Sequence, residues 1–189
     1  LHKLGYSSVA IDLRGHGKSS KPSYGYTLEI FSKDISTIIK KYFNKKPIIV
    51  GQSMGANLGV MLASYSKPIV KGSICIDGGF INLKTKFPDW SECKKQLTPP
   101  DFDNISASQL KELIKNHHPD WSELSIQGTL NNWKVFNNLK IRRRLSEKKH
   151  LLILKSLWKH NPIKINQVNA PTLLIYSTLQ NKIRDFQKA

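Results

Sequence analysis

Short apolar runs alternate with a helical pattern along much of the chain. These runs occupy residues 9–13, 48–50, 72–77 and 172–176. After Thr27, which is placed as an N-cap, apolar side chains recur at helical spacing and predict a helix over about 28–43: Leu28, Phe31, Ile35, Ile38, Ile39 and Tyr42. Short apolar strands that alternate with helices are typical of a parallel sheet with buried faces. The pattern therefore predicts an α/β fold.

Residues 82–165 break this alternation, because they are helical, polar and aromatic and show no clear strand. Ser106 and Gln109 fit a capping box at the start of a helix. The pentapeptide Pro-Asp-Trp-Ser-Glu occurs at 88–92 and again at 119–123, where it predicts two similar helix starts. We interpret the segment as an inserted helical cap. All four tryptophans of the chain fall in it, and they either pack the cap's own core or line a ligand pocket: Trp90, Trp121, Trp133 and Trp158.

The net charge of the chain is large, but it adds little to the prediction of function. The chain carries 30 Lys and Arg against 13 Asp and Glu, a formal net charge of +17. The lysines are scattered along the whole chain, which indicates a solvated surface, and only Arg142-Arg143-Arg144 forms a compact cluster. We therefore expect neither nucleic acid nor a membrane as a partner. Binding of a polyanion through the arginine cluster is the weaker alternative.

The sequence shows no run of about eighteen apolar residues that could span a membrane. It also begins without the basic and then apolar pattern of a secretory leader. The two cysteines, Cys75 and Cys93, are too few for a disulfide framework, and Cys75 lies in an apolar run. These features favour a reduced, cytoplasmic protein.

Candidate chemistry lies in Gly51-Gln52-Ser53-Met54-Gly55, which follows the apolar run Ile48–Val50 and precedes a small-residue helix. This G-x-S-x-G pattern between a strand and a helix is that of a nucleophile elbow, which lifts one serine out of the sheet. Glycines at 51 and 55 are expected to avoid clashes in so tight a turn. The helix N-terminus behind Ser53 favours negative charge. The alternative is a serine in an ordinary strand–helix turn.

Three segments together resemble the α/β-hydrolase superfamily: Asp12–Ser19, Gly51–Gly55 and Pro171–Ile175. The resemblance implies a partial α/β-hydrolase core over 1–81 and 166–189, with a parallel sheet flanked by helices and the cap inserted at 82–165. It makes Ser53 the nucleophile and the Met54 backbone N–H an oxyanion donor. It implies no cofactor and no metal.

The same resemblance leaves the rest of a catalytic triad incomplete. The acid is expected either at Asp77, just after the third apolar run, or in the loop after 173–176, where the first carboxylate is the distant Asp185. We favour Asp77 over Asp185; the alternative for Asp77 is an aspartate that caps the following turn. The base should follow the last strand, and the sequence ends first. His16 is expected to be structural, and three further histidines to be exposed on the cap: His117, His118 and His160.

In the family's strand order, a strand missing before Leu1 would lie between those at 9–13 and 48–50. The segment alone is therefore expected to fold poorly or to associate, and to show negligible turnover unless a partner chain supplies a histidine. The function implied by the resemblance is acyl transfer on an ester-like or related bond of a small molecule through Ser53. The alternative is a truncated or degenerate relative without activity, either a binding module or a gene remnant.

Overall fold

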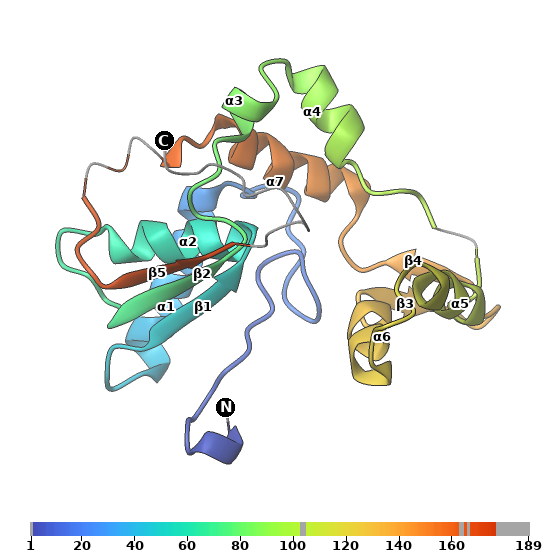
Figure 1. The fold of residues 1–189 in the computed structure, drawn as a ribbon, viewed down its shortest axis with the longest axis horizontal. Helices are drawn as coiled ribbons and strands as arrows, with labels where there is room; N and C mark the ends of the chain where they lie inside the picture. Colours follow the sequence, from blue (N-terminus) through green and yellow to red (C-terminus); the bar gives the residue numbers. More distant parts are fainter. Residues whose placement is uncertain (1, 103–104, 163–164, 166, 177–189) are drawn as a thin grey trace. The chain divides into compact units, whose positions relative to one another are not determined.

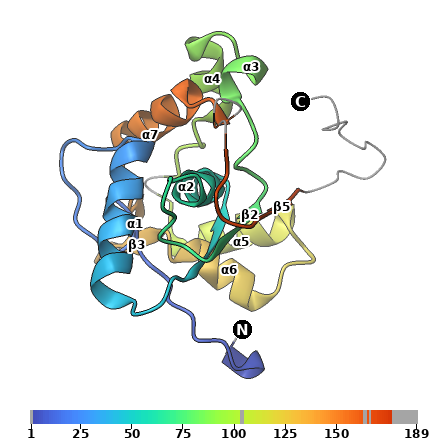
Figure 2. The same ribbon diagram turned by 90° about the vertical axis from the view of Figure 1, so that its left-hand side faces the viewer.

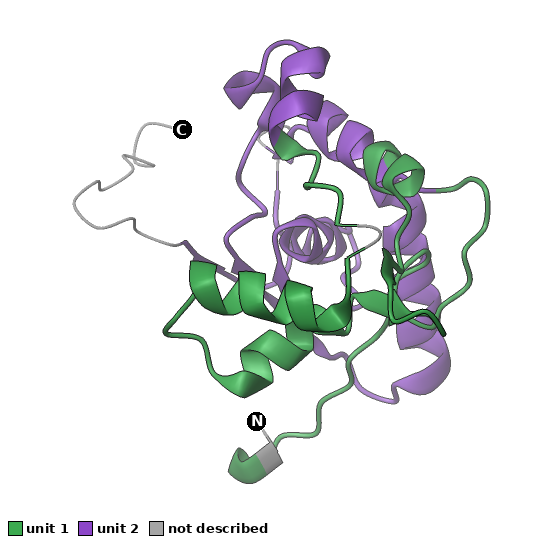
Figure 3. Ribbon diagram, turned by 90° about the vertical axis from the view of Figure 1, so that its right-hand side faces the viewer, with its two compact units in different colours: residues 1–25, 97–152 green, residues 26–96, 153–189 purple. Residues whose placement is uncertain are grey.

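The computed structural model describes residues 2–102, 105–162, 165 and 167–176 (Figure 1). Its contacts divide the chain into two compact units, residues 1–25 with 97–152 and residues 26–96 with 153–189 (Figure 3). In chain order the elements are η1 (His2–Leu4), α1 (Leu28–Tyr42), β1 (Ile48–Gln52), α2 (Met54–Ala63), β2 (Gly72–Ile76), α3 (Leu83–Lys86), α4 (Trp90–Leu97), α5 (Ala107–His117), α6 (Glu123–Leu130), β3 (Trp133–Val135), β4 (Ile141–Arg143), α7 (Glu147–Lys159) and β5 (Thr172–Ile175).

A parallel three-stranded sheet forms the centre of the unit made of residues 26–96 and 153–189. The strand order is β1-β2-β5, and Val50, Ile74 and Leu173 lie side by side in register. Helix α2 packs on the face that carries the buried side chains of Ser73 and Cys75, and α1 packs against α2. Figure 2 shows α2 end-on between α1 and the strands. The predicted parallel α/β arrangement is confirmed.

The helix expected over about 28–43 is α1, which buries most of the predicted apolar face, including Leu28, Phe31 and Ile35. Tyr42, predicted on the same face, is 68% exposed. Thr27 occupies the N-cap position, but its side chain accepts no capping hydrogen bond. The backbone N–H of Leu28 instead donates to the hydroxyl of Ser156 in α7, at 3.0 Å. A contact distant in sequence therefore replaces the local cap that the sequence suggested.

The other face of the sheet carries apolar side chains that remain exposed. Ile48 and Val50 of β1 are 53% and 57% accessible, and Leu173 and Ile175 of β5 are 55% and 42% accessible. Side chains at alternate strand positions point to the same face, so these four share the face opposite α2. In parallel sheets both faces are normally covered. This face is therefore an apolar surface within its unit.

Residues 9–13, predicted as a strand, form none in the structure, and Val9 and Ile11 are 67% and 40% exposed. An apolar run becomes a strand only where a neighbour completes its hydrogen bonds, and no described strand pairs with this one. The turn that follows begins at Asp12, whose carboxylate accepts from the Lys18 N–H at 2.8 Å and whose carbonyl accepts from the Ser19 hydroxyl at 2.6 Å. The glycine-rich turn is thus held by the aspartate that opens it.

The unit made of residues 1–25 and 97–152 has a core between α5, α6 and an antiparallel hairpin of β3 and β4. Its buried members are Leu110, Ile114, Ile126 and Ile141. The predicted capping box at α5 is confirmed, with Ser106 and Gln109 making both reciprocal hydrogen bonds. The expectation that 82–165 contains no strand is wrong, because strands of three residues are too short to show a period in the sequence.

The repeated pentapeptide begins two helices in different ways. In the first copy Asp89 accepts hydrogen bonds from the N–H groups of Ser91 and Glu92, at 2.8 and 3.1 Å, and the helix starts at Trp90. In the second copy the cap is Ser122, which accepts from the Ser125 N–H at 3.2 Å. The same five residues therefore do not fix where the helix begins, and the surrounding structure determines its first residue.

The tryptophans lie in separate environments. Trp90 and Trp158 contact each other with ring centroids 5.8 Å apart, and the Lys155 ammonium lies 4.2 and 4.4 Å from the two centroids. Trp133 packs on the core of the other unit, and Trp121 stacks on His118 while remaining 39% exposed. The segment 82–165 contributes to both compact units, so its status as one inserted cap stays a prediction.

Candidate active site

Ser53 lies at the turn between the carboxyl end of β1 and the start of α2. Its backbone has φ 50° and ψ −111°, and its side chain is exposed. A residue other than glycine in this region costs about 1–3 kcal/mol and persists only where the surroundings impose it. The strand, sharp turn and helix expected around Ser53 are confirmed. The strained backbone indicates that the surrounding structure constrains this position and that the side chain is exposed at a cost in backbone energy.

Hydrogen bonds around Ser53 hold the strained turn. Its N–H donates to the Ile76 carbonyl at 2.9 Å, which continues the pairing of β1 with β2. Its carbonyl accepts from the N–H groups of Ala56 and Asn57, at 3.1 and 3.2 Å, and from the Asn57 side-chain amide at 3.1 Å. The backbone on both sides of the serine is therefore fixed while its hydroxyl stays accessible.

Asn57 is a residue that the sequence analysis missed. It is 7% exposed, and its Oδ1 has no hydrogen-bond partner among the described residues. Burial of an amide is costly unless its hydrogen bonds are made, and here the amide NH₂ bonds the carbonyl of Ser53. Its signal in the sequence was a polar side chain on the small-residue face of the helix, one turn beyond Ser53. Asn57 is a positioning residue for the turn.

Two glycines bring the backbone of the turn close to its neighbours. A Cβ on Gly51 would overlap the Gly55 carbonyl and come within 2.8 Å of the Ala56 nitrogen. A Cβ on Gly78 would come within 2.6 Å of the Ser53 carbonyl oxygen. A Cβ on Gly55 would meet no described atom within 4 Å, so the expectation that Gly55 avoids a clash is wrong. The close approach is made at 51 and 78.

The first residue of α2 is Met54, directly after the serine. The first N–H groups of a helix have no acceptor within the helix and carry partial positive charge. A negatively charged oxygen formed at Ser53 would therefore meet favourable dipoles there. This arrangement suits the oxyanion-donor role that the sequence suggests for the Met54 N–H, and that role stays a prediction.

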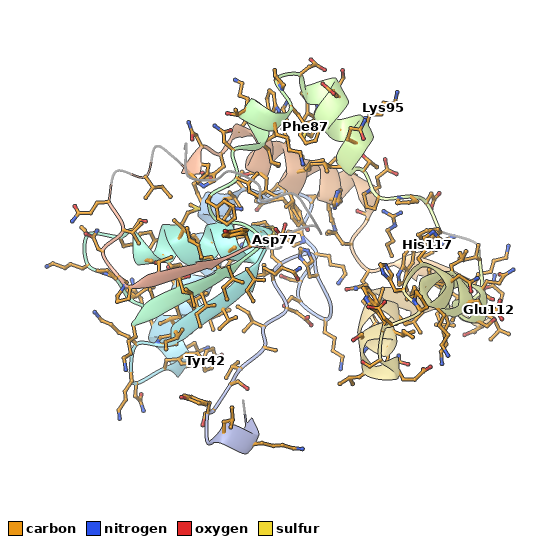
Figure 4. All side chains as sticks on the ribbon, in the orientation of Figure 1. Tyr42, Asp77, Phe87, Lys95, Glu112 and His117 are labelled. Carbon is orange, nitrogen blue, oxygen red and sulfur yellow. The ribbon has the colours of Figure 1, made fainter. Side chains whose placement is uncertain are left out.

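Asp77 follows β2 at the same edge of the sheet. Gln52 and Ile76 are paired in register, so Ser53 and Asp77 each come directly after one of two adjacent strands. Figure 4 shows Asp77 at this end of the sheet. Asp77 is exposed, has φ 48°, and is anchored by its N–H, which donates to the Ile175 carbonyl at 2.7 Å. The structure thus brings both predicted residues to the carboxyl ends of neighbouring strands. Asp185, the alternative acid, lies outside the described residues.

Three histidines lie within hydrogen-bonding distance of backbone carbonyls. Ring nitrogens of His16, His117 and His150 approach the carbonyls of Arg14, Leu113 and Leu97 at 3.1, 2.9 and 3.3 Å. Each of these contacts joins two residues of the unit made of residues 1–25 and 97–152. The base that would accept the proton of Ser53 stays a matter for the proposed function.

His117 and His118 are exposed as expected, but the same expectation for His160 is wrong. His160 is half-buried, and its Nε2 is buried without a hydrogen-bond partner among the described residues. Burial lowers the pKa of its imidazole, and the Glu29 carboxylate acts in the opposite direction. Its position after α7, against the amino-terminal end of α1, explains the burial, because Ser156 of the same helix end bonds Leu28.

Both cysteines are buried and free. Burial raises the pKa of the Cys75 thiol and of the Cys93 thiol. Thiols held in the neutral form are poor nucleophiles, so neither competes with Ser53 as a candidate.

Of the helices in the described ranges, none has both the length and the apolar character needed to cross a bilayer.

The geometry is that of an α/β protein with a serine at a strand-to-helix elbow. A family model described as alpha/beta hydrolase fold matches residues 1–179. The chain belongs to the α/β-hydrolase superfamily.

Relatives of known name support this assignment. Human Protein ABHD8 is 38% identical over 79 residues, which are 41% of this chain and 18% of that protein. The 2-(acetamidomethylene)succinate hydrolase of Mesorhizobium japonicum is 35% identical over 72 residues, 38% of this chain and 26% of that enzyme. The matched segments thus span about a quarter or less of these curated relatives.

Solved structures show the same fold. E-2-(acetamidomethylene)succinate hydrolase superposes with a TM-score of 0.69 at 22% identity, covering 86% of this chain and 60% of that one. The thioesterase domain from the curacin biosynthetic pathway gives 0.67 at 22% identity, covering 94% and 68%. Similarity at this level establishes the architecture.

Proposed function

We propose that the chain is the part of a serine hydrolase that carries the nucleophile, and that it acts by acyl transfer on an ester-like or related bond of a small molecule. The Ser53 oxygen attacks the carbonyl carbon while its proton passes to a base. The base then gives this proton to the leaving group as the bond between that group and the carbonyl carbon breaks, and water hydrolyses the acyl-enzyme. The Met54 N–H donates to the oxyanion of the tetrahedral intermediate. Asp77 is the acid that orients the base.

The observation that carries the proposal is the conformation of Ser53. An exposed serine with φ 50° between a strand and a helix N-terminus is strained, and the strain is maintained by Gly51, Gly78 and Asn57. A serine in an ordinary turn has no need of this support. Two similar proteins are hydrolytic by name, a 2-(acetamidomethylene)succinate hydrolase and a thioesterase domain.

Labelling with a fluorophosphonate tests the proposal, because this probe phosphonylates an activated serine and displaces fluoride. We expect the adduct on the peptide that contains Ser53, with a rate that added imidazole raises at least about tenfold by acting as the base. Ser66, exposed beyond the end of α2, is the internal control and should stay unlabelled. Equal labelling of Ser53 and Ser66, with or without imidazole, would favour the inactive, degenerate relative.

The role of Asp77 is tested by making the Asp77→Asn change at the matching position of a homologous hydrolase that contains a histidine base. In the serine protease template, the corresponding change costs about 10⁴ in turnover because the histidine takes the wrong tautomer. We expect a loss of that order in turnover with little change in melting temperature, since the side chain is exposed. Asp185→Asn is the matched control. Full activity of Asp77→Asn with loss in Asp185→Asn would move the acid to the second position.

A further inference from the structure

The hairpin of residues 133–143 combines exposed cations with exposed apolar side chains. Lys134, Lys140 and Arg142 are exposed. Near them, Phe136 and Leu139 are 38% and 70% exposed, whereas Val135 is paired with buried Ile141 and points to the other face of the hairpin. No acidic residue occurs in the sequence between Glu123 and Glu147, so the hairpin contains no counter-charge of its own.

In the structure, the three consecutive arginines at 142–144 have different roles. A guanidinium nitrogen of Arg143 donates to the Pro99 carbonyl at 3.1 Å, and Arg144 Nε donates to the Asn131 carbonyl at 2.9 Å. These two arginines hold the hairpin to its own unit. The outward charge of the hairpin comes instead from Arg142 with Lys134 and Lys140.

Lys134 and Arg142 are directly opposite each other in the hairpin. Like charges in this position destabilise a strand pair. The Phe136 ring lies near both, with its centroid 5.2 Å from the Lys134 ammonium and 5.4 Å from the Arg142 guanidinium carbon. The arrangement concentrates positive charge around an exposed aromatic ring, which is the local condition for attracting an anionic partner.

Leu139 lies at the tip in a strained conformation. Its φ is 61°, a region normally taken by glycine or asparagine at this point of a hairpin loop. The turn is closed by the Leu139 N–H, which donates to the Phe136 carbonyl at 2.8 Å, and by the Phe136 N–H, which donates to the Lys140 carbonyl at 2.9 Å. A leucine at this position is strained and exposed, so its presence is not explained by a contribution to the stability of the hairpin.

We propose that the hairpin of residues 133–143 docks on an anionic lipid surface, with Leu139 at its tip entering the headgroup boundary and Lys134, Lys140 and Arg142 contacting lipid phosphates and carboxylates. Apolar side chains bounded by cations are the composition of interfacial membrane contacts. A nucleic acid would use the cations but leaves the exposed Leu139 without a role, since bases stack on aromatic rings. The proposal departs from the sequence-based expectation that no membrane is involved.

Sedimentation of the chain with vesicles tests the proposal. We expect binding to vesicles of phosphatidylcholine with phosphatidylserine, and little binding to phosphatidylcholine alone or in high salt. Lys134→Gln with Arg142→Gln should weaken binding more than tenfold, because each cation near such a surface contributes about fivefold. Lys45→Gln with Lys46→Gln, which removes the same charge from an exposed loop of the other unit, is the control and should change binding little.

Leu139→Asn separates lipid docking from attraction by charge alone. Asparagine tolerates a positive φ, so this variant should unfold at the same or a higher urea concentration, while its vesicle binding falls about tenfold. Leu124→Asn is the matched control, since Leu124 is 84% exposed on α6 of the same unit, and should keep full binding. If Leu139→Asn binds vesicles as the parent does, or if a single-stranded oligonucleotide binds more tightly than the vesicles, the proposal is overturned.

Discussion

Replacing Ser53 by alanine is expected to remove the imidazole-assisted hydrolysis of p-nitrophenyl acetate that depends on the protein. We expect the protein-dependent rate to fall at least about a hundredfold, because alanine has no oxygen to form the acyl-enzyme and general-base assistance by imidazole then has no nucleophile to act on. The measurement is the release of p-nitrophenol with saturating imidazole, corrected for the reaction of imidazole in buffer.

Ser66→Ala is the control for this experiment, because it removes an exposed hydroxyl close to the end of the same helix. Its rate should equal that of the parent chain. Without imidazole, turnover by the 189-residue chain is expected to be negligible, since a serine hydroxyl is a poor nucleophile unless a base takes its proton. Hydrolysis that survives Ser53→Ala, or that disappears equally in Ser66→Ala, would remove Ser53 from the mechanism.

The second large effect is expected at Gly51. A Cβ at this position would overlap the Gly55 carbonyl, and the atoms it meets are backbone, which cannot rotate away. We expect Gly51→Ala to lower the free energy of unfolding by about 3 kcal/mol, at the upper end of the usual cost of overpacking. For a chain of this size the melting temperature should fall by roughly 6–12 °C. The measurement is thermal unfolding followed by circular dichroism.

Gly55→Ala is the matched control, four residues further along the same motif. Its Cβ would meet no described atom within 4 Å, and alanine is a better helix former than glycine by about 1 kcal/mol. We expect this variant to melt at the same or a higher temperature than the parent. Equal destabilisation by both substitutions would show that the motif tolerates neither glycine change, and that the close approach at Gly51 is not what distinguishes them.

Much of the site could be predicted because its signals are local. Apolar runs followed by glycine-flanked Ser53 specify a strand, a turn and a helix within a few residues, and the structure shows this sequence of elements. The same holds for α1, whose apolar face is written at helical spacing, and for the capping box at Ser106 and Gln109. In these cases the groups that interact are neighbours in the chain.

The predictions from the sequence are wrong where a contact with a segment distant in the sequence determines the local structure. Residues 9–13 have the composition of a strand but lie outside the sheet, since no described strand completes their hydrogen bonds. His160 looked exposed in a polar segment, yet packing of the end of α7 near α1 buries its Nε2. The hairpin of β3 and β4 escaped notice because three residues show no period.

The sequence by itself determined that a serine stands between an apolar strand and a helix, because glycine spacing and apolar patterning act on adjacent residues. Only the tertiary structure decided what surrounds that serine: the register that sets Asp77 beside it, the close approach of Gly78 and the buried amide of Asn57. These depend on strand pairing and helix packing between segments well apart in the chain. Such contacts form only when the whole unit folds, so no local pattern encodes them.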